Sequence, residues 1–505
     1  MTEQTMPFWL KQRALLTPGR TAVVGDGEQV TFGELNQRAR RLAYFLAGLG
    51  VRRGDHVALL MTNRLLTVEL IHAISYLGAV IVPLNTRLTP AELAWQLNDV
   101  EASLLIYDTA YGDKVEQLKD EVSCQICADS QLDGVNAGQV DDHQVSLVEH
   151  IALDDVHTII YTSGTTGRPK GTLLTFGNHW WSAIGSSLNL GLHADDRWLC
   201  CLPLFHVSGL SILMRSVICG MTVVLHDKFD PQRVNEAIGR DKVTIISVVT
   251  AMLTAMLDTL STERYPEHLR CVLLGGGPAP LPLLKACVSR SIPVYQTYGL
   301  TETASQIVTL SPDDILAKVG SAGKPLFPAQ LRIVSDGQEM GAGQIGEIIV
   351  KGPNVTKGYY KREDATAQAI QDGWLYTGDL GYVDEDGFLY VVDRRNDLII
   401  SGGENVYPAE VESALLAHPD VKEAGVTAAP DPKWGAVPVA FIVTREGATL
   451  TEAELVAYCT QRLARYKVPK KIYFVSQLPR NASNKLLRRE LRSLVQQERQ
   501  PGAQG

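Results

Sequence analysis

The chain has 505 residues, more than one hydrophobic core normally supports, so at least two domains are expected. Its net charge of −9 at pH 7 argues against nucleic acid as a main partner, while local basic sites for an anionic ligand are compatible with it. With 45% apolar and 20% charged residues, the composition is that of an ordinary globular protein, and a homo-oligomer is compatible with it.

No segment predicts export or membrane insertion. Residues 1–12 lack the basic start and apolar core of a signal peptide, and the most apolar run, 70–84, is too short to span a bilayer. The eight cysteines are scattered, which favours reduced thiols. Cys124 and Cys127 have C-x-x-C spacing but lack the second pair of a zinc site. We therefore expect a cytoplasmic protein without a membrane span.

Helix and strand signals alternate through about residue 300. Thr31-Phe-Gly-Glu34 is a capping box that predicts a helix, and a second capped helix start begins at Thr89-Pro90. Apolar strands are predicted between such helices, among them 57–61, 156–162 and 243–249. This alternation predicts parallel sheets covered by helices.

The pattern changes after about residue 320. Short strands at 330–334, 347–350 and 388–392, separated by glycine-rich turns, predict a small antiparallel barrel or sheet. A new unit starts after residue 393, with helices predicted at 408–416 and 451–464 and strands at 423–428 and 439–443. The fold class is therefore α/β: a large N-terminal domain of helix-covered sheets plus a small β-barrel, then a small α+β domain.

The stretch 161–171, Tyr-Thr-Ser-Gly-Thr-Thr-Gly-Arg-Pro-Lys-Gly, has the chemistry of a phosphate cradle. Its glycines free the backbone for tight turns, its hydroxyls donate hydrogen bonds, and Arg168 and Lys170 add positive charge. It is not the common P-loop, because Pro169 stands where that motif requires glycine. The cradle residues are Thr162, Ser163, Gly164, Thr165, Thr166, Gly167 and Lys170.

The whole stretch resembles the phosphate loop of adenylate-forming enzymes: acyl-CoA synthetases, luciferases and peptide-synthetase adenylation domains. The resemblance covers about residues 8 to 490. It implies an enzyme that joins a small carboxylic acid to ATP with Mg²⁺, forming an acyl-adenylate, and passes the acyl group to coenzyme A. It also implies a large ATP- and acid-binding domain at 1–393, a hinge at 394–396, a small mobile domain at 397–495 and a flexible tail at 496–505.

Other segments then take roles that the resemblance implies for ATP. The glycines of 274–278 would lie along the adenine. The Tyr-Gly-Leu-Thr-Glu string at 298–302, which follows a short strand predicted at 293–297, would supply an aromatic face, a phosphate-binding hydroxyl and a Mg²⁺ ligand. Tyr-Thr-Gly-Asp at 376–379 predicts a carboxylate at a turn after a strand, and this Asp and a downstream Arg resemble the family's ribose clamp. The residues concerned are Gly275, Gly276, Gly277, Tyr298, Gly299, Thr301, Glu302, Asp379 and Arg394.

Three further positions concern movement between the two domains. Asn396 takes the hinge position, where the family usually has Asp or Lys. Gly402 and Gly403 would face the site while the thioester forms, near the pantetheine of coenzyme A. Lys485 takes the position of the catalytic lysine, although Asn484 replaces the usual preceding glycine. Asn tolerates the backbone angles that such a turn needs.

The acid pocket is expected around His206, which follows Leu-Pro-Leu-Phe at a strand-to-helix junction. Peptide-synthetase domains carry there an Asp that pairs with an amino group, so His206 favours an acid without one. The strings at 175–179, 196–198, 220–226 and 480–485 resemble the subfamily of 2-succinylbenzoate–CoA ligases in menaquinone synthesis. The second carboxylate of such a substrate would need a polar recess, with His206, Ser208 and Thr301 as candidates.

The implied catalytic set is Lys485, Thr301, Glu302 and His206. Other functions share these motifs. A ligase for another aryl or fatty acid has the same catalytic residues, and a luciferase-like oxygenase forms the same adenylate. A nucleotide-binding regulator without catalysis is the alternative from a different class, and the presence of Lys485, Glu302 and Asp379 argues against it.

Overall fold

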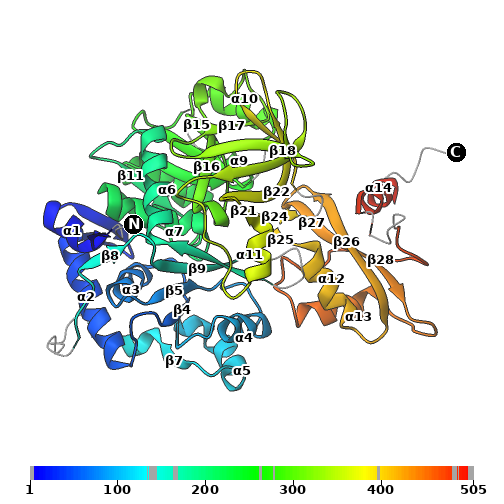
Figure 1. Cartoon of the computed structure of the whole chain (residues 1–505), viewed down its shortest axis with the longest axis horizontal. Coiled ribbons are helices and arrows are strands. Elements are labelled where there is room, and N and C mark those ends of the chain that lie inside the picture. The colour runs from blue at the N-terminus through cyan, green and yellow to red at the C-terminus, as the bar shows by residue number, and fades with distance from the viewer. Residues whose placement is uncertain are drawn as a thin grey trace.

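Two lobes of unequal size form the molecule in the computed structural model (Figure 1). The structure describes residues 5–132, 135, 145–162, 169–260, 264–276, 279–394, 398–479, 486 and 488–498. The large lobe runs from the N-terminus to the yellow strands, and the small lobe, in orange and red, lies beside it. The predicted α/β class, with a large N-terminal domain and a small α+β C-terminal domain, is confirmed.

A six-stranded sheet forms one part of the large lobe. Its order is β10-β9-β5-β4-β6-β7, and its neighbours pair in parallel except β10 with β9. The glycine-rich stretch therefore connects the two strands of an antiparallel hairpin. The strands are β4 (His56–Leu60), β5 (Val80–Pro83), β6 (Leu104–Tyr107), β7 (Gln125–Ala128), β9 (Val156–Thr162) and β10 (Lys170–Thr175). A separate small pair joins β1 (Thr5–Pro7) to β8 (His150–Ala152).

A fifteen-stranded sheet forms the rest of the large lobe, in the order β19-β18-β20-β22-β23-β17-β16-β15-β14-β13-β11-β12-β2-β3, with β21 beside β22. Pairing is parallel from β15 to β2 and antiparallel from β15 to β19, so the predicted antiparallel unit continues the parallel one. The strands are β2 (Thr21–Gly25), β3 (Glu28–Thr31), β11 (Arg197–Cys200), β12 (Thr222–Leu225), β13 (Ile245–Val249), β14 (Cys271–Gly275), β15 (Val294–Leu300), β16 (Ser305–Leu310), β17 (Ser321–Pro325), β18 (Gln330–Ser335), β19 (Gln338–Glu339), β20 (Gly346–Lys351), β21 (Ile370–Gln371), β22 (Trp374–Val383) and β23 (Leu389–Arg394).

Helices cover these sheets, and two begin at the predicted capping boxes. Thr31 and Glu34 exchange hydrogen bonds at the start of α2, and Thr89 and Glu92 do the same for α4. The helices are α1 (Trp9–Leu16), α2 (Phe32–Gly48), α3 (Leu65–Tyr76), α4 (Pro90–Asp99), α5 (Gly112–Leu118), α6 (Phe176–Leu190), α7 (Val207–Cys219), α8 (Pro231–Arg240), α9 (Thr250–Thr259), α10 (Leu281–Ser289) and α11 (Glu363–Ala369).

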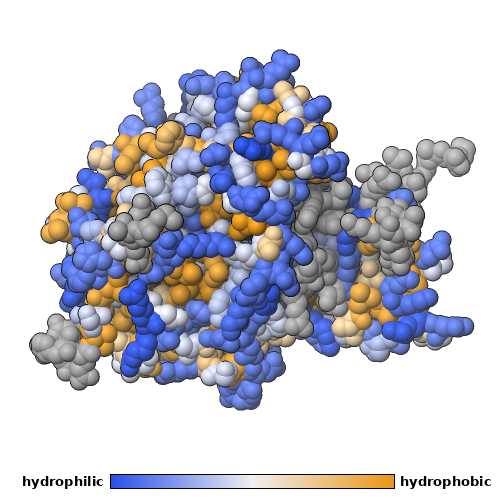
Figure 2. Space-filling view, viewed as in Figure 1, coloured by the Kyte–Doolittle hydropathy of each residue, from blue (hydrophilic) through white to orange (hydrophobic). Residues whose placement is uncertain are grey.

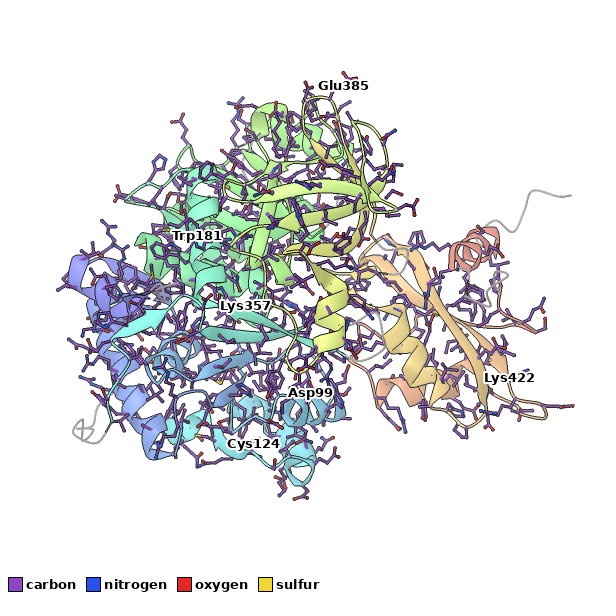
Figure 3. The ribbon with its side chains drawn as sticks, in the orientation of Figure 1. Asp99, Cys124, Trp181, Lys357, Glu385 and Lys422 are labelled. Atoms are coloured by element: carbon purple, nitrogen blue, oxygen red, sulfur yellow. The ribbon has the colours of Figure 1, made fainter. Side chains whose placement is uncertain are left out.

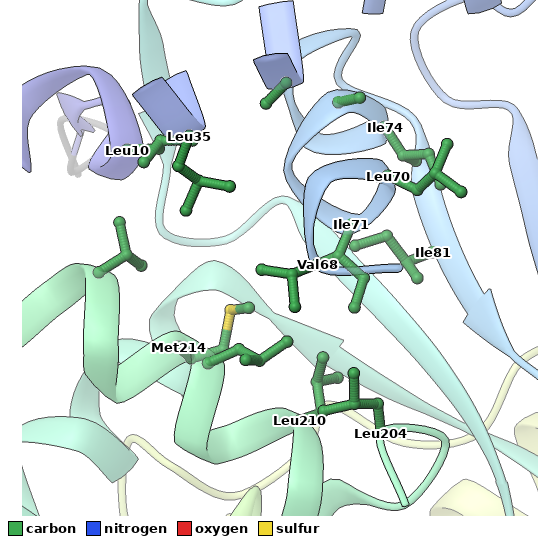
Figure 4. Packing of buried hydrophobic residues seen from close by; sticks show 14 of the residues in the cluster. Leu10, Leu35, Val68, Leu70, Ile71, Ile74, Ile81, Leu204, Leu210 and Met214 are labelled. Carbon is green, nitrogen blue, oxygen red and sulfur yellow. The ribbon is translucent and has the colours of Figure 1, made fainter. Parts of the chain in front are cut away.

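The largest hydrophobic core lies between α2, α3 and α7. Leu35 of α2, Ile71 of α3 and Leu210 of α7 belong to this one buried cluster, and Figure 4 shows them converging. Burying each such side chain contributes about 1.5–3 kcal/mol, so this core joins the two sheets firmly. Figure 2 shows that hydrophilic side chains cover most of the visible face, with smaller hydrophobic groups between them. In the described ranges, no helix combines the length and apolar character needed to cross a membrane.

The small lobe has its own sheet, in the order β25-β24-β27-β26, with β28 beside β27. The long hairpin of β26 and β27 carries Lys422 and stands well away from Cys124 of the large lobe (Figure 3). The elements are β24 (Ile399–Ser401), β25 (Glu404–Val406), α12 (Pro408–Leu416), β26 (Val421–Asp431), β27 (Gly435–Thr444), α13 (Glu452–Thr460), β28 (Ile472–Phe474) and α14 (Arg488–Glu498).

Two local expectations were wrong and one helix was missed. Strand β15 continues through Tyr298 to residue 300, and Asp379 lies inside β22 instead of in a turn. Tyr298 pairs with β16 and Asp379 pairs with β23, and this pairing outweighs the local glycine signals. Helix α14 was not predicted at all; it is mostly polar, and it buries Leu491 and Val495 against the small-lobe sheet.

Candidate active site

A cleft of about 680 Å³ opens between the lobes and collects most of the predicted site residues. Its wall includes strand ends of both large sheets, the start of α7 and the β24–β25 turn of the small lobe. The predicted residues that line it are Thr162, Lys170, His206, Ser208, Gly275, Gly276, Gly299, Thr301, Glu302, Asp379 and Gly403. Ser163, Gly164, Thr165, Thr166, Gly167, Gly277, Asn396 and Lys485 lie outside the described residues.

The two ends of the glycine-rich stretch meet at the cleft. Thr162 and Lys170 are register partners on β9 and β10, and both line the cleft. The Lys170 ammonium lies 5.1 Å from the ring centre of Tyr359, and the Tyr359 hydroxyl donates to Glu302 over 3.0 Å. A cation and a carboxylate thus share one end of the cleft, as a magnesium–triphosphate group requires.

Glu302 stands on a short 3-10 turn, Thr301–Thr303, directly after β15. The approach to this turn needs glycine, because a Cβ on Gly299 would lie 2.1 Å from the Ser305 carbonyl oxygen. Burial raises the pKa of Glu302 above its ordinary value, against the lowering effect of the Tyr359 hydrogen bond and Lys170. The charge of Asp379 acts in the same direction as burial, and a divalent cation bound by Glu302 would stabilise the ionised form of this carboxylate.

The other nucleotide-binding candidates are held by backbone pairing. Asp379 and Arg394 are register partners on β22 and β23, so their backbones lie side by side although they are far apart in the sequence. Tyr298 is buried, and its hydroxyl donates to Asp379 over 2.7 Å, so this hydrogen bond fixes the orientation of the carboxylate. Gly276 has φ 82°, and a Cβ there would lie 3.1 Å from Val249. Only glycine suits this position next to the cleft.

His206 stands at the N-terminal end of α7, on a loop that one buried amide organises. The Asn63 side chain donates to the carbonyl of Leu202 over 2.8 Å and accepts from the backbone N–H of Leu204 over 2.9 Å. His206 then meets the small lobe, with its Nε2 3.1 Å from Glu404. Arg87 contacts the same carboxylate, and although burial acts to raise the pKa of Glu404, its interactions with His206 and Arg87 hold that pKa below its ordinary value.

Arg215 is a site residue that our sequence reasoning missed. It lies on α7, is only 1% exposed and lines the same cleft as His206 and Ser208. Its Nη1 donates to Ser211 over 3.0 Å and its guanidinium lies 5.1 Å from the Trp198 ring centre. Among the described residues, its Nε and Nη2 have no hydrogen-bond partner. A single charged residue, Arg215, in an otherwise uncharged helix was the available signal.

Burial lowers the pKa of Arg215 to about 10, which leaves the guanidinium charged at neutral pH. A buried cation with two unsatisfied N–H groups is costly unless an anion meets it. Because Arg215 lines the cleft, its guanidinium can pair with an anionic group of a ligand.

The small lobe reaches the cleft through the β24–β25 turn. Gly402 and Gly403 have φ 59° and 87°, and a Cβ on Gly402 would lie 2.5 Å from the Trp434 ring. Gly403 lines the cleft and faces Val249 of the large lobe. A side chain at Gly402 would strain the backbone and collide with the indole, so the turn requires glycine.

Comparison with known proteins agrees with this geometry. Residues 10–360 match the AMP-binding enzyme family, and residues 410–485 match the AMP-binding enzyme C-terminal domain. A curated 2-succinylbenzoate–CoA ligase from Geobacillus kaustophilus is 58% identical over 492 residues, covering 97% of this chain and 98% of that protein.

Two solved structures of o-succinylbenzoate CoA synthetase from Bacillus subtilis are each 50% identical to the chain. A double mutant bound with its product analogue OSB-NCoA has a TM-score of 0.92 and covers 97% of this chain and 99% of that one. The complex with ATP and magnesium ion has a TM-score of 0.75 and covers 97% and 100%. The chain belongs to the AMP-binding enzyme family, in the group whose curated members are named 2-succinylbenzoate–CoA ligase.

Proposed function

We propose that the chain is an ATP-dependent 2-succinylbenzoate–CoA ligase of menaquinone biosynthesis. The observation that carries the proposal is the buried guanidinium of Arg215, which lines the same cleft as Glu302 and has N–H groups without a partner among the described residues. A substrate with two carboxylates suits this cleft: one carboxylate reacts, and the other pairs with Arg215. The identity to curated 2-succinylbenzoate–CoA ligases supports this assignment. ATP and coenzyme A are cytoplasmic metabolites, and we place the reaction there.

In the first half-reaction, a substrate carboxylate oxygen attacks the α-phosphorus of ATP, and pyrophosphate leaves with its bonding electron pair. The protein mainly holds charge and keeps the attack in line. We assign the phosphates to the stretch 162–170, the ribose to Asp379 with Arg394, and the adenine to the glycines at 275–277. Lys485 bridges the reacting oxygens. Magnesium, when bound through Glu302, neutralises charge on the triphosphate.

In the second half-reaction, the thiol sulfur of coenzyme A attacks the acyl carbonyl, and AMP leaves as the thiol proton is lost. We assign the glycine turn at 402–403 to the path of the pantetheine, because it lines the cleft beside Val249. The contacts of Glu404 with His206 and Arg87 hold this turn in place. The two half-reactions use one acyl site, so the activated intermediate stays away from water.

The lobe arrangement in this structure corresponds to the second half-reaction. The two solved structures are equally identical in sequence to the chain, so divergence cannot explain why their TM-scores differ by so much. The arrangement here is nearer to the product-analogue complex. We infer that residues 394–396, with Asn396 as pivot, let residues 397–495 rotate between an ATP-using and a thioester-forming arrangement.

The buried charge of Arg215 distinguishes a ligase for 2-succinylbenzoate from a fatty-acid ligase. A fatty-acid ligase needs an apolar tunnel, and a desolvated guanidinium in that wall would oppose an alkyl chain. The test is ATP–pyrophosphate exchange with a panel of acids: 2-succinylbenzoate, benzoate, coumarate and fatty acids. We expect exchange with 2-succinylbenzoate well above the others. Exchange with fatty acids alone would refute the substrate, and exchange with no acid would favour a regulator.

A further inference from the structure

A buried cluster of three charges joins the lobes on the side of the cleft near α4. The Lys467 ammonium donates to Glu410 of its own lobe and to Glu92 of the large lobe, each over 2.7 Å. The side chains of Lys467, Glu410 and Glu92 are only 4%, 7% and 13% exposed. No step of the proposed reaction uses these residues, so their burial calls for another explanation.

The two carboxylates have different relations to the lysine. Glu410 lies in the first turn of α12 in the same lobe as Lys467, so the two stay together however the lobes rotate. Glu92 belongs to the other lobe, so its contact with Lys467 depends on how the lobes are arranged. Burial alone would lower the pKa of Lys467, but attraction to Glu410 and Glu92 outweighs it and raises that pKa, which keeps the ammonium charged.

Glu92 is well suited to this contact because its other oxygen is already fixed. Its Oε2 accepts from the backbone N–H and the hydroxyl of Thr89, each over 2.8 Å, in the capping box of α4. Its Oε1 is thereby aimed at Lys467 with little remaining freedom, which reduces the entropy cost of pairing. The Thr89 hydroxyl also lies 3.3 Å from the Arg462 carbonyl of the small lobe.

We propose that Glu92 and Lys467 form an interlobe clamp that selects the thioester-forming arrangement. They are positioning residues that act through lobe orientation, and the inference rests on the proposed two-step function. A contact shifts a conformational equilibrium only by the difference in its strength between the two states. The Glu92–Lys467 pair satisfies this condition, whereas the Lys467–Glu410 pair is the same in both states and keeps the lysine neutralised after rotation.

The test uses Glu92→Gln in the full chain. Glutamine preserves the acceptor that caps α4 but removes the charge that meets Lys467. The matched control is Glu34→Gln, because Glu34 makes the same capping box with Thr31 on α2, which lies on the side of the large lobe away from the small lobe (Figure 1). Thermal unfolding of both variants checks that each folds. Single-turnover thioester formation from supplied 2-succinylbenzoyl-adenylate and coenzyme A is compared with ATP–pyrophosphate exchange.

We expect Glu92→Gln to slow thioester formation about 5- to 30-fold, the effect of losing one or two kcal/mol from an equilibrium, and to leave exchange within about twofold of wild type. Glu34→Gln should leave both steps unchanged. In a Lys467→Gln background the effect of Glu92→Gln should disappear, because the partner is gone. Equal slowing of both steps, or wild-type thioester formation, would overturn the clamp.

Small-angle X-ray scattering of the free chain gives a readout that does not depend on catalysis. Glu92→Gln should move the scattering curve away from that calculated for the arrangement seen here, and Glu34→Gln should not. If the wild-type chain forms no thioester, the proposed substrate is refuted, and the scattering comparison still tests whether Glu92 and Lys467 form the clamp. A wild-type chain that forms the thioester no faster than Glu92→Gln would refute the clamp alone.

Discussion

Replacing Arg215 by Met should lower activity and at the same time stabilise the protein. The guanidinium is fully buried, and its pKa, lowered to about 10 from 12.5, corresponds to a cost of about 3 kcal/mol for the charged form in the folded chain. Below both pKa values this cost is fully present, so it applies at pH 7. Methionine fills much of the same space without a charge, so we expect the free energy of unfolding to rise by about 1–3 kcal/mol.

The activity should change in the opposite direction. A carboxylate about 4 Å from the guanidinium gains about 4 kcal/mol at an effective dielectric constant of 20. Leaving that carboxylate unpaired in the cleft should therefore reduce kcat/KM for 2-succinylbenzoate about 10²- to 10³-fold. Arg215→Lys keeps the charge without the planar fork, so it should lie between wild type and Arg215→Met.

The assay is acid-dependent ATP–pyrophosphate exchange with 2-succinylbenzoate and with two analogues that each lack one carboxylate. Wild type should prefer the diacid strongly over the analogue that keeps only the reacting carboxylate, and Arg215→Met should lose this preference. Thermal unfolding measures the stability. A variant that unfolds earlier yet keeps the preference would refute the reasoning, since it would make Arg215 a purely structural residue.

Three other changes test separate parts of the molecule. Lys485→Ala should abolish exchange but spare thioester formation from supplied adenylate; equal loss of both would contradict its assignment to the first step. Glu302→Gln should reduce exchange about 10²- to 10³-fold and raise the magnesium concentration needed for half-maximal rate, while unchanged magnesium dependence would argue against a metal ligand. Burial lowers the pKa of His72 to about 4 and of His179 to about 3, so the unfolded chain binds protons before the folded chain as the pH falls below about 6.5. Each of the two histidines should therefore lower the free energy of unfolding by about 2 kcal/mol between pH 6.5 and 5. Measured by urea unfolding, the His72→Leu variant should lose less stability over that pH range than wild type.

The local sequence predicted those parts of the fold that depend on neighbouring residues. Thr31 with Glu34 and Thr89 with Glu92 start α2 and α4 as expected, because a capping box needs only residues three positions apart. Strand β9 has the predicted bounds, since a continuous β-branched run is buried whichever strands it pairs with. Helix α14 was not predicted, because its two buried residues pack against a sheet whose position the sequence does not reveal.

By itself, the sequence determined the alternation of elements, and it predicted a phosphate-binding role for 161–171 and, through its resemblance to known enzymes, the residues proposed for ATP. Only the tertiary structure showed that Arg215 lines the cleft and that Glu92 meets Lys467, because these arrangements join residues that the chain separates widely. Partners of that kind depend on how lobes and sheets pack, and no local pattern encodes the packing. The same reason explains why Asp379 looked like a turn residue until its strand was seen between two neighbours.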